Sequence, residues 1–212
     1  MIGIGMSGWM ADFGEYLPVD AVLYEGNPKE LHNRWPAIWA KLNSEAIEEC
    51  KAGDEVFFFT RAGFTETIKS SAMMWTGDQH VDWSIDDGLP SVIPATLSLA
   101  MSGYGITHSD AGGYTTIMHM RRDKELLMRW EEMNAFSPLF RTHEGNQPGN
   151  NVQYNKDKEL LEHTIKCMDW HALLKNYIKS CVEEAVSNGT PVMRPVFYHY
   201  DEEWAYTETT EY

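Results

Sequence analysis

Residues 55–78 read EVFFFTRAGFTETIKSSAMMWTGD, and two strand-like runs lie within them. The first run, residues 55–60, is rich in Phe, and the second, residues 72–76, ends in Trp and Thr, both compositions that favour β-strands. Each run is followed at once by a polar cluster with glycine, which contains Arg61 after the first and Asp78 after the second. Sites in parallel βα proteins are built at the carboxyl ends of strands, so this stretch predicts two strands of such a sheet with functional residues at their ends.

The same alternation continues on both sides of this stretch. Further strands are expected at residues 2–6, 105–107 and 136–140. Apolar residues recur with helical spacing between Pro36 and Cys50, from Leu126 to Met133, and from Asp157 to Gly189, where a break is expected near Trp170. Strands that alternate with helices predict an α/β fold with a parallel sheet covered by helices.

The composition excludes several classes of protein. With 212 residues, 43% of them hydrophobic, the chain can bury a core. Its 17 Lys and Arg against 32 Asp and Glu give a net charge of −15. A broad basic face, as nucleic-acid binding requires, is therefore not expected, and neither is attraction to an anionic membrane surface.

The cysteines and the N-terminal residues bear on the compartment. Cys50, Cys167 and Cys181 share no CxxC spacing, which argues against a disulfide framework and against a thiolate zinc site. No signal-peptide pattern and no long apolar span occur in the sequence. We therefore expect a cytoplasmic protein with no nucleic-acid or membrane partner.

Two short patterns are considered and set aside. Gly3, Gly5 and Gly8 satisfy GxGxxG, but only two residues precede the first glycine, and Gly14 and Pro18 interrupt the helix that a dinucleotide site needs. Histidines follow several of the expected strands, without the helical or thiol-linked spacing of a metal site. No metal and no cofactor is expected.

Two aspartates stand out at strand ends. Asp12 and Asp78 each follow a strand candidate. Glycoside hydrolysis needs two carboxyl groups, one that attacks the anomeric carbon and one that protonates the leaving oxygen. A lone Asp in a loop is, however, more often a cap or turn residue, so composition and spacing leave both interpretations open.

Several ordered motifs resemble glycoside hydrolase family 31, the retaining α-glycosidases. They are Gly8-Trp9-Met10-Ala11-Asp12-Phe13-Gly14-Glu15, Trp75-Thr76-Gly77-Asp78, Ser109-Asp110-Ala111-Gly112-Gly113-Tyr114 and Arg141-Thr142-His143. Within that family, the runs at residues 10–18, 83–89 and 141–146 are most similar to sulfoquinovosidases. The likeness extends over essentially the whole chain.

The resemblance implies a role for each matching residue. Asp12 matches the nucleophile and Asp78 the general acid/base of a retaining mechanism. Arg61, Asp110 and His143 match positions that contact the hydroxyls of the sugar. The remaining matches in the site are Trp75, a substrate-site residue expected to pack beside the acid/base, and Glu15, a supporting residue.

The resemblance also implies an architecture and a substrate. Residues 1–190 are expected to form the second half of a TIM (β/α)₈ barrel, and residues 191–212, with a β-like run at 192–200, the beginning of a truncated C-terminal β-sandwich domain. Exposed strand edges in such a half barrel favour pairing with a second copy. The expected substrate is an α-sulfoquinovoside. The alternatives are a neutral-sugar α-glucosidase or α-xylosidase of the same family, or a catalytically inert fragment. Residues 64–69 depart from the family pattern and border the expected site, where they bear on aglycone preference and activity.

Overall fold

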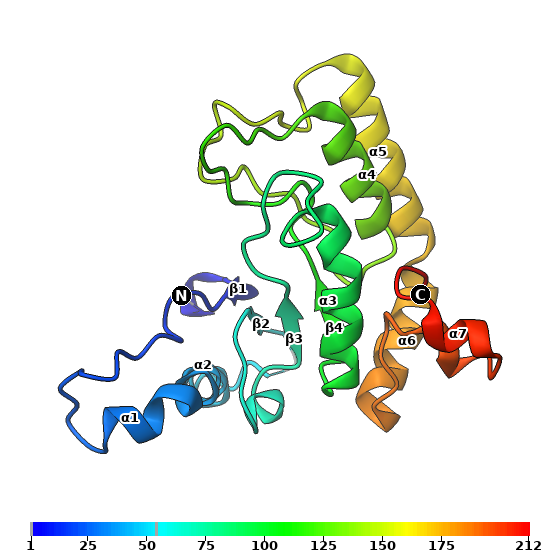
Figure 1. Cartoon of the computed structure of the whole chain (residues 1–212). Helices are drawn as coiled ribbons and strands as arrows, with labels where there is room; N and C mark the ends of the chain where they lie inside the picture. The colour runs from blue at the N-terminus through cyan, green and yellow to red at the C-terminus, as the bar shows by residue number, and fades with distance from the viewer. Residues whose placement is uncertain (1, 54) are drawn as a thin grey trace. The chain divides into compact units, whose positions relative to one another are not determined.

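The computed structural model describes residues 2–53 and 55–212 and divides the chain into two units, Met1–Met74 and Trp75–Tyr212. Figure 1 shows their elements. The first unit contains η1 (Ile2–Ile4), β1 (Gly8–Met10), α1 (Pro28–Leu31), η2 (His32–Arg34), α2 (Trp35–Glu49), β2 (Phe57–Thr60), η3 (Thr67–Lys69) and β3 (Met73–Trp75), whose last residue begins the second unit.

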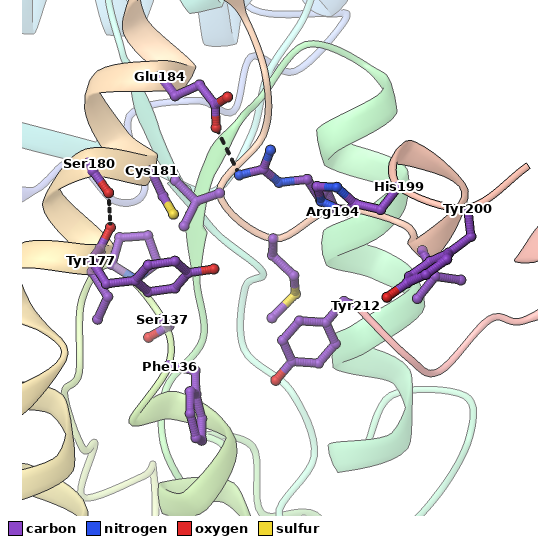
Figure 2. A pocket seen from close by; sticks show the side chains of 15 residues that line it. Phe136, Ser137, Tyr177, Ser180, Cys181, Glu184, Arg194, His199, Tyr200 and Tyr212 are labelled. Atoms are coloured by element: carbon purple, nitrogen blue, oxygen red, sulfur yellow. Dashed lines mark hydrogen bonds and ion pairs between the residues drawn. The ribbon is translucent and has the colours of Figure 1, made fainter.

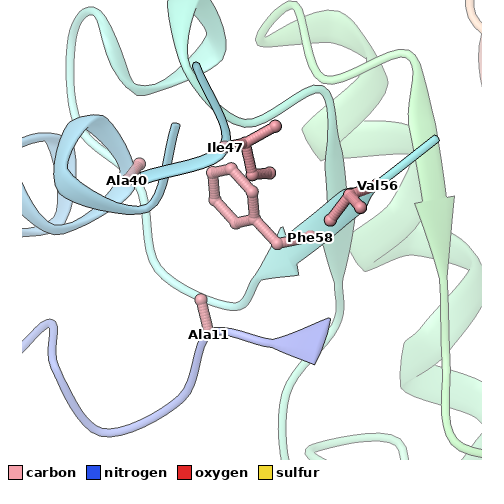
Figure 3. Packing of buried hydrophobic residues seen from close by; sticks show 5 residues of the cluster. All are labelled: Ala11, Ala40, Ile47, Val56 and Phe58. Atoms are coloured by element: carbon pink, nitrogen blue, oxygen red, sulfur yellow. The ribbon is translucent and has the colours of Figure 1, made fainter. Parts of the chain in front are cut away.

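The strands of the first unit are parallel. Gly8, Trp9 and Met10 of β1 lie opposite Phe57, Phe58 and Phe59 of β2, and β2 in turn pairs with β3 through Phe59 and Met73. Helix α2 connects β1 to β2 and packs on this sheet. The helix buries Ala40 and Ile47 against Ala11, Val56 and Phe58 (Figure 3). This βαβ arrangement confirms the strands expected at 55–60 and 72–76 and the helix expected between Pro36 and Cys50, which precedes them.

The second unit is built mainly from helices. It contains α3 (Leu89–Met101), β4 (Ile106–His108), α4 (Lys124–Asn134), α5 (Lys158–Leu173), α6 (Lys175–Asn188), η4 (Val196–Tyr198) and α7 (Glu203–Thr207). Val92 of α3, Ala111, and Leu126 and Trp130 of α4 form its core cluster. Helices α4 and α5 lie side by side (Figure 1).

Polar caps explain where these helices begin. The Asp123 carboxylate accepts a hydrogen bond from the backbone N of Leu126 at 2.8 Å, and Asp157 does the same for Leu160 at 3.0 Å. Such caps satisfy backbone donors that the first helical turn leaves open. Gly189 ends α6 with φ of +80°, a conformation that glycine adopts without steric cost. The break expected near Trp170 occurs at Leu174 instead, between α5 and α6.

Three expected strands are wrong. Residues 2–4 form a 3₁₀ turn, because Gly5 takes a left-handed φ of +94°, and the strand begins only at Gly8. Residues 136–140 form turns in which the Ser137 hydroxyl hydrogen bonds to the carbonyls of Asn134 and Leu139. The run at 192–200 forms a 3₁₀ helix after Pro195, which has no N–H for a strand ladder.

Helix α3 is an element that the sequence analysis missed. Pro90 and Pro94 fall within its bounds, and prolines ordinarily argue against a helix interior. Pro90 lies in the first turn, where its missing N–H is tolerated. Burial of Val92, Leu97 and Ala100 stabilises the rest of the helix despite Pro94.

Two further observations concern the C-terminal segment and the lengths of the helices. Residues 191–212, all of which the structure describes, hold η4 and α7 and no strand, so a β-domain that begins there stays a prediction. Within the described residues, every helix is too short or too polar to cross a lipid bilayer.

Candidate active site

Asp12 lies in the turn that follows β1, on a backbone held by its neighbours. The backbone N of Ala11 donates to the Phe59 carbonyl of β2 at 2.9 Å, which extends the strand pairing to the residue before Asp12. Trp39 of α2 donates its indole N–H to the Ala11 carbonyl at 3.3 Å. Its ring also lies against Gly14, where a Cβ would fall 2.2 Å from the ring. A glycine at 14 is therefore required for this turn.

A single guanidinium joins the two acidic residues of this turn. Nε of Arg61, which follows β2, lies 2.8 Å from Oδ1 of Asp12 and 2.7 Å from Oε1 of Glu15. The side chains of Arg61 and Glu15 are 9% and 4% exposed, and that of Asp12 is 24% exposed. The guanidinium thus lies between the two carboxylates, and of these Asp12 keeps the greater contact with solvent.

Aromatic rings complete this group. Nη2 of Arg61 donates to the Tyr16 hydroxyl at 2.9 Å, and the guanidinium lies over the rings of Phe13 and Tyr16 at 4.8 and 5.6 Å. Such stacking fixes the plane of an arginine. The first unit thus brings together three predicted site residues, Asp12, Glu15 and Arg61, and adds Tyr16 to them.

Asp78 occupies a tight turn after β3, in the second unit. Gly77 takes a left-handed φ of +96°, and Gln79 hydrogen bonds through its side chain to the hydroxyl and the carbonyl of Thr76. The Asp78 carbonyl accepts from the Thr115 hydroxyl at 2.7 Å. These contacts fix the backbone of Asp78. Trp75, directly before this turn, is only 1% exposed and is packed in the interior.

Asp110 follows β4 and is buried in an ion pair with Arg141. Nε of Arg141 also donates to Nε2 of His108 at 3.2 Å. Burial first, and the charge of Arg141 second, lower the pKa of His108 to about 3, so His108 is a neutral hydrogen-bond acceptor. Helix α4 holds the residue before Asp110 in place, because Trp130 and Asn134 of this helix hydrogen bond to Ser109.

His143 belongs to the same region of the second unit. Its Nδ1 accepts a hydrogen bond from the backbone N of Gly145 at 3.1 Å, and its ring stands edge-on to Tyr114 at 4.8 Å. Burial, together with Arg141, lowers the pKa of His143, whereas Asp78 acts in the opposite direction. A neutral ring that accepts at Nδ1 carries its proton on Nε2, so His143 offers a donor to a ligand hydroxyl.

Sequence reasoning missed three residues of this region. His108 is the last residue of β4, and Arg141 directly follows the run at 136–140 that was expected to be a strand. The position after an expected strand singled out the other candidates, and that signal could have found both residues. Arg122 is 2% exposed and donates to the carbonyls of Val152 at 2.8 Å and His143 at 2.7 Å. No local pattern distinguishes Arg122, because its partners lie about twenty to thirty residues further along the chain.

A separate cavity of about 990 Å³ lies in the second unit between α6 and the 192–200 segment (Figure 2). Arg194 on its wall donates to Glu184 at 3.0 Å. None of the seven predicted site residues lines it. The cavity is therefore distinct from both groups described above.

Comparisons with known proteins give one family. Residues 1–180 match the model of the glycosyl hydrolases family 31 TIM-barrel domain. The chain is 54% identical over 213 residues to a sulfoquinovosidase of Escherichia coli (strain K12) and 46% identical over 204 residues to one of Agrobacterium fabrum. These alignments cover 100% and 96% of the chain, but 31% of each relative.

A solved structure gives the same result. A family 31 sulfoquinovosidase from E. rectale, in complex with the aza-sugar inhibitor IFGSQ, superposes with a TM-score of 0.94 at 46% identity. The superposition covers 98% of this chain and 32% of that one. The chain thus spans about a third of the length of the relatives it matches.

Proposed function

The chain belongs to glycosyl hydrolases family 31 and forms part of its TIM-barrel domain, and on that premise we propose that the protein it belongs to hydrolyses α-sulfoquinovosides with retention of anomeric configuration. Two curated relatives that align with nearly the whole chain are named sulfoquinovosidases, which supports this substrate class. The observation that carries the chemistry is the buried Arg61 guanidinium, 2.8 Å from the Asp12 carboxylate.

In the proposed first step, an Asp12 carboxylate oxygen attacks the anomeric carbon. The bond from that carbon to the aglycone oxygen breaks, and Asp78 gives its proton to the departing oxygen. The product of this step is a glycosyl ester on Asp12. The ion pair with Arg61 supports this role for Asp12, because a nucleophile must be ionised before it attacks.

In the second step, Asp78 acts as a base. Its carboxylate takes a proton from water, the water oxygen bonds to the anomeric carbon, and the ester bond to Asp12 breaks. Two inversions at one carbon give net retention. The tight turn around Gly77 and Gln79 supports this assignment, because it fixes the backbone that carries Asp78.

The remaining predicted residues are assigned to sugar binding and support. His143 offers an Nε2 proton to a sugar hydroxyl, and the buried Asp110 is held by Arg141. Glu15 is proposed to position Arg61, and Trp75, almost fully buried, to pack beside the acid/base turn. The mechanism needs water as its only co-reactant.

The stereochemical course tests the mechanism directly. Proton NMR of the first product formed from an aryl α-sulfoquinovoside by the full-length protein should show the α-anomer before mutarotation. A β-anomer as first product would exclude the double-displacement mechanism and with it the nucleophile role of Asp12.

Two variants separate the roles of the aspartates. Asp12→Ala should lower kcat by several orders of magnitude with every substrate, roughly 10⁴-fold or more. In Asp78→Ala, kcat/KM, which reports the first step, should fall far less with a nitrophenyl aglycone than with an alkyl aglycone, because nitrophenolate leaves without protonation. Asp86→Ala, an exposed residue of the same unit, is the matched control and should retain normal rates. An equal loss of kcat/KM with both aglycones would exclude Asp78 as the general acid.

The substrate is tested against the neutral-sugar alternative. The chain is also 29% identical to an α-glucosidase and 26% identical to an α-xylosidase. The ratio of kcat/KM for nitrophenyl α-sulfoquinovoside over nitrophenyl α-glucoside should exceed about 100, the discrimination expected of a site that pairs a charged substrate group. A ratio below one would favour the neutral-sugar alternative.

A further inference from the structure

Three potential metal ligands converge between α4 and α5, and none of them belongs to the residues of the proposed active site. They are the Glu131 carboxylate on α4 and, on α5, His163 and Cys167, which are four residues apart and so lie on one face of the helix. Their ligand atoms all lie within 4.8 Å of one another. Figure 1 shows the two helices side by side.

The distances suit a small tetrahedral ion. Cys167 Sγ lies 3.4 Å from His163 Nε2. A zinc ion bound by sulfur at about 2.3 Å and nitrogen at about 2.0 Å in tetrahedral geometry separates those two atoms by about 3.6 Å. A further carboxylate oxygen, Oε1 of Glu132, lies 3.8 Å from the same Nε2.

The buried carboxylate lacks a full set of partners. Glu131 is 0% exposed, and its two oxygens lie 2.9 and 3.0 Å from one donor, the Thr164 hydroxyl. That hydroxyl also lies 3.0 Å from the Leu160 carbonyl, and its single proton cannot serve all three oxygens. Arg122, the nearby cation, directs its hydrogen bonds to carbonyls such as those of Val152 and His143.

A buried carboxylate in this situation needs a proton or a cation. Sulfur, imidazole nitrogen and carboxylate oxygen are together the ligand types of zinc. Thiolate and carboxylate would also balance the charge of a divalent ion.

We propose that Glu131, His163 and Cys167 form a zinc-binding site that joins α4 to α5. Binding displaces the thiol proton of Cys167 to solvent, and His163, whose Nε2 lies 3.2 Å from the Met128 carbonyl, gives up that hydrogen bond and carries its proton on Nδ1. Sγ, Nε2 and a Glu131 oxygen then bond to the ion, with water or Glu132 in the fourth position. The role is structural. Trp130 and Asn134 of α4 hold Ser109, so the site stabilises the helix that supports the turn at Asp110.

Cobalt(II) is the probe for the first test, in the full-length protein after removal of metal. The wild type should show the intense visible bands of tetrahedral cobalt and a near-ultraviolet sulfur-to-cobalt charge-transfer band. Cys167→Ser should lose the charge-transfer band, and the cobalt affinity should fall at least about tenfold. Cys181→Ser is the matched control, because Cys181 is also a buried cysteine, on the next helix, and lies outside the cluster. No cobalt spectrum in the wild type, or an unchanged one in Cys167→Ser, overturns the proposal.

A second measurement needs no variant and covers the case in which Cys167→Ser fails to fold. One equivalent of zinc should slow alkylation of Cys167 by about tenfold or more relative to Cys181 in the same wild-type molecule, read by peptide mass spectrometry. Equal rates with and without zinc for both cysteines would reject the site.

Discussion

Nε of Arg61 lies 2.8 Å from Oδ1 of Asp12, and the same atom lies 2.7 Å from Oε1 of Glu15. One buried cation therefore interacts with two carboxylates of a single turn. Glu15 is the more buried of the two, at 4% side-chain exposure against 24% for Asp12. The arrangement leaves Asp12 accessible while Glu15 holds the guanidinium in place, which fits a nucleophile and its support.

Replacing Arg61 should therefore impair catalysis. Arg61→Met should lower kcat/KM by roughly 10²- to 10³-fold, because a fixed positive charge beside the nucleophile is lost. Arg61→Lys should retain only part of the wild-type kcat/KM, since an ammonium cannot reproduce the planar contacts to Asp12, Glu15 and Tyr16. The measurement is steady-state hydrolysis of a nitrophenyl glycoside, with Lys41→Met on the exposed face of α2 as control. Normal turnover in Arg61→Met would show that the reaction does not need the guanidinium.

The turn at Asp12 depends on a glycine. In Gly14→Ala the new methyl would fall 2.2 Å from the Trp39 ring, so either the ring or the turn must move. The expected cost is roughly 1–3 kcal/mol of stability, with a loss of activity because Asp12 moves with the turn. Gly53→Ala is the control, since no atom lies within 4 Å of its Cβ position. Urea unfolding of both variants measures the difference, and equal midpoints would contradict the steric argument.

The ion pair between Asp110 and Arg141 should matter for stability. Asp110→Asn leaves a largely buried guanidinium without its counter-charge, which costs about 3–5 kcal/mol. Glu125→Gln breaks an exposed pair with Arg129 on α4 and should leave the unfolding midpoint unchanged. Denaturant titration at neutral pH distinguishes the two. A midpoint for Asp110→Asn equal to that of Glu125→Gln would mean that Arg141 finds compensation elsewhere.

His108 should make stability depend on pH. The folded chain keeps His108 neutral down to its pKa of about 3, whereas the unfolded chain takes up a proton below the ordinary value of 6.5. Protons therefore favour the unfolded state, and the stability present above pH 6.5 is lost as the pH falls towards 3. For one proton the slope is at most about 1.4 kcal/mol per pH unit.

The variant His108→Gln isolates this contribution. Glutamine keeps an oxygen that can accept from Arg141 but takes up no proton, so the acid loss of stability should become shallower between pH 6.5 and 3. His199→Gln, at an exposed position, is the control. The check is the unfolding free energy measured at several pH values, and parallel curves for wild type and His108→Gln would refute the assignment.

Local patterns predicted much of the fold. The Phe-rich run at β2, the apolar spacing of α2 and α4 and the helix start at Asp157 all act within a few residues, and each element formed where expected. The strands expected at residues 2–6 and 136–140 failed where backbone details overrode composition, in the left-handed Gly5 and in the hydrogen bonds of Ser137.

The candidate site was predictable only as a set of residues. Motif positions singled out Asp12, Arg61 and Asp78, but no spacing indicated that Arg61 would contact both Asp12 and Glu15. Arg122 escaped notice for the same reason, since its partner carbonyls lie about 21 to 30 residues away. Contacts at such separations depend on how whole elements pack.

The sequence by itself determined the alternation of strands and helices, the strand ends that carry the polar clusters, and the family resemblance, because these properties depend on short-range patterning and residue identity. Only the tertiary structure placed the Arg61 guanidinium on two carboxylates, kept His108 neutral through burial, and gathered Glu131, His163 and Cys167 between two helices. Burial and charge pairing are properties of the packed chain, since they arise only when residues distant in sequence exclude water together.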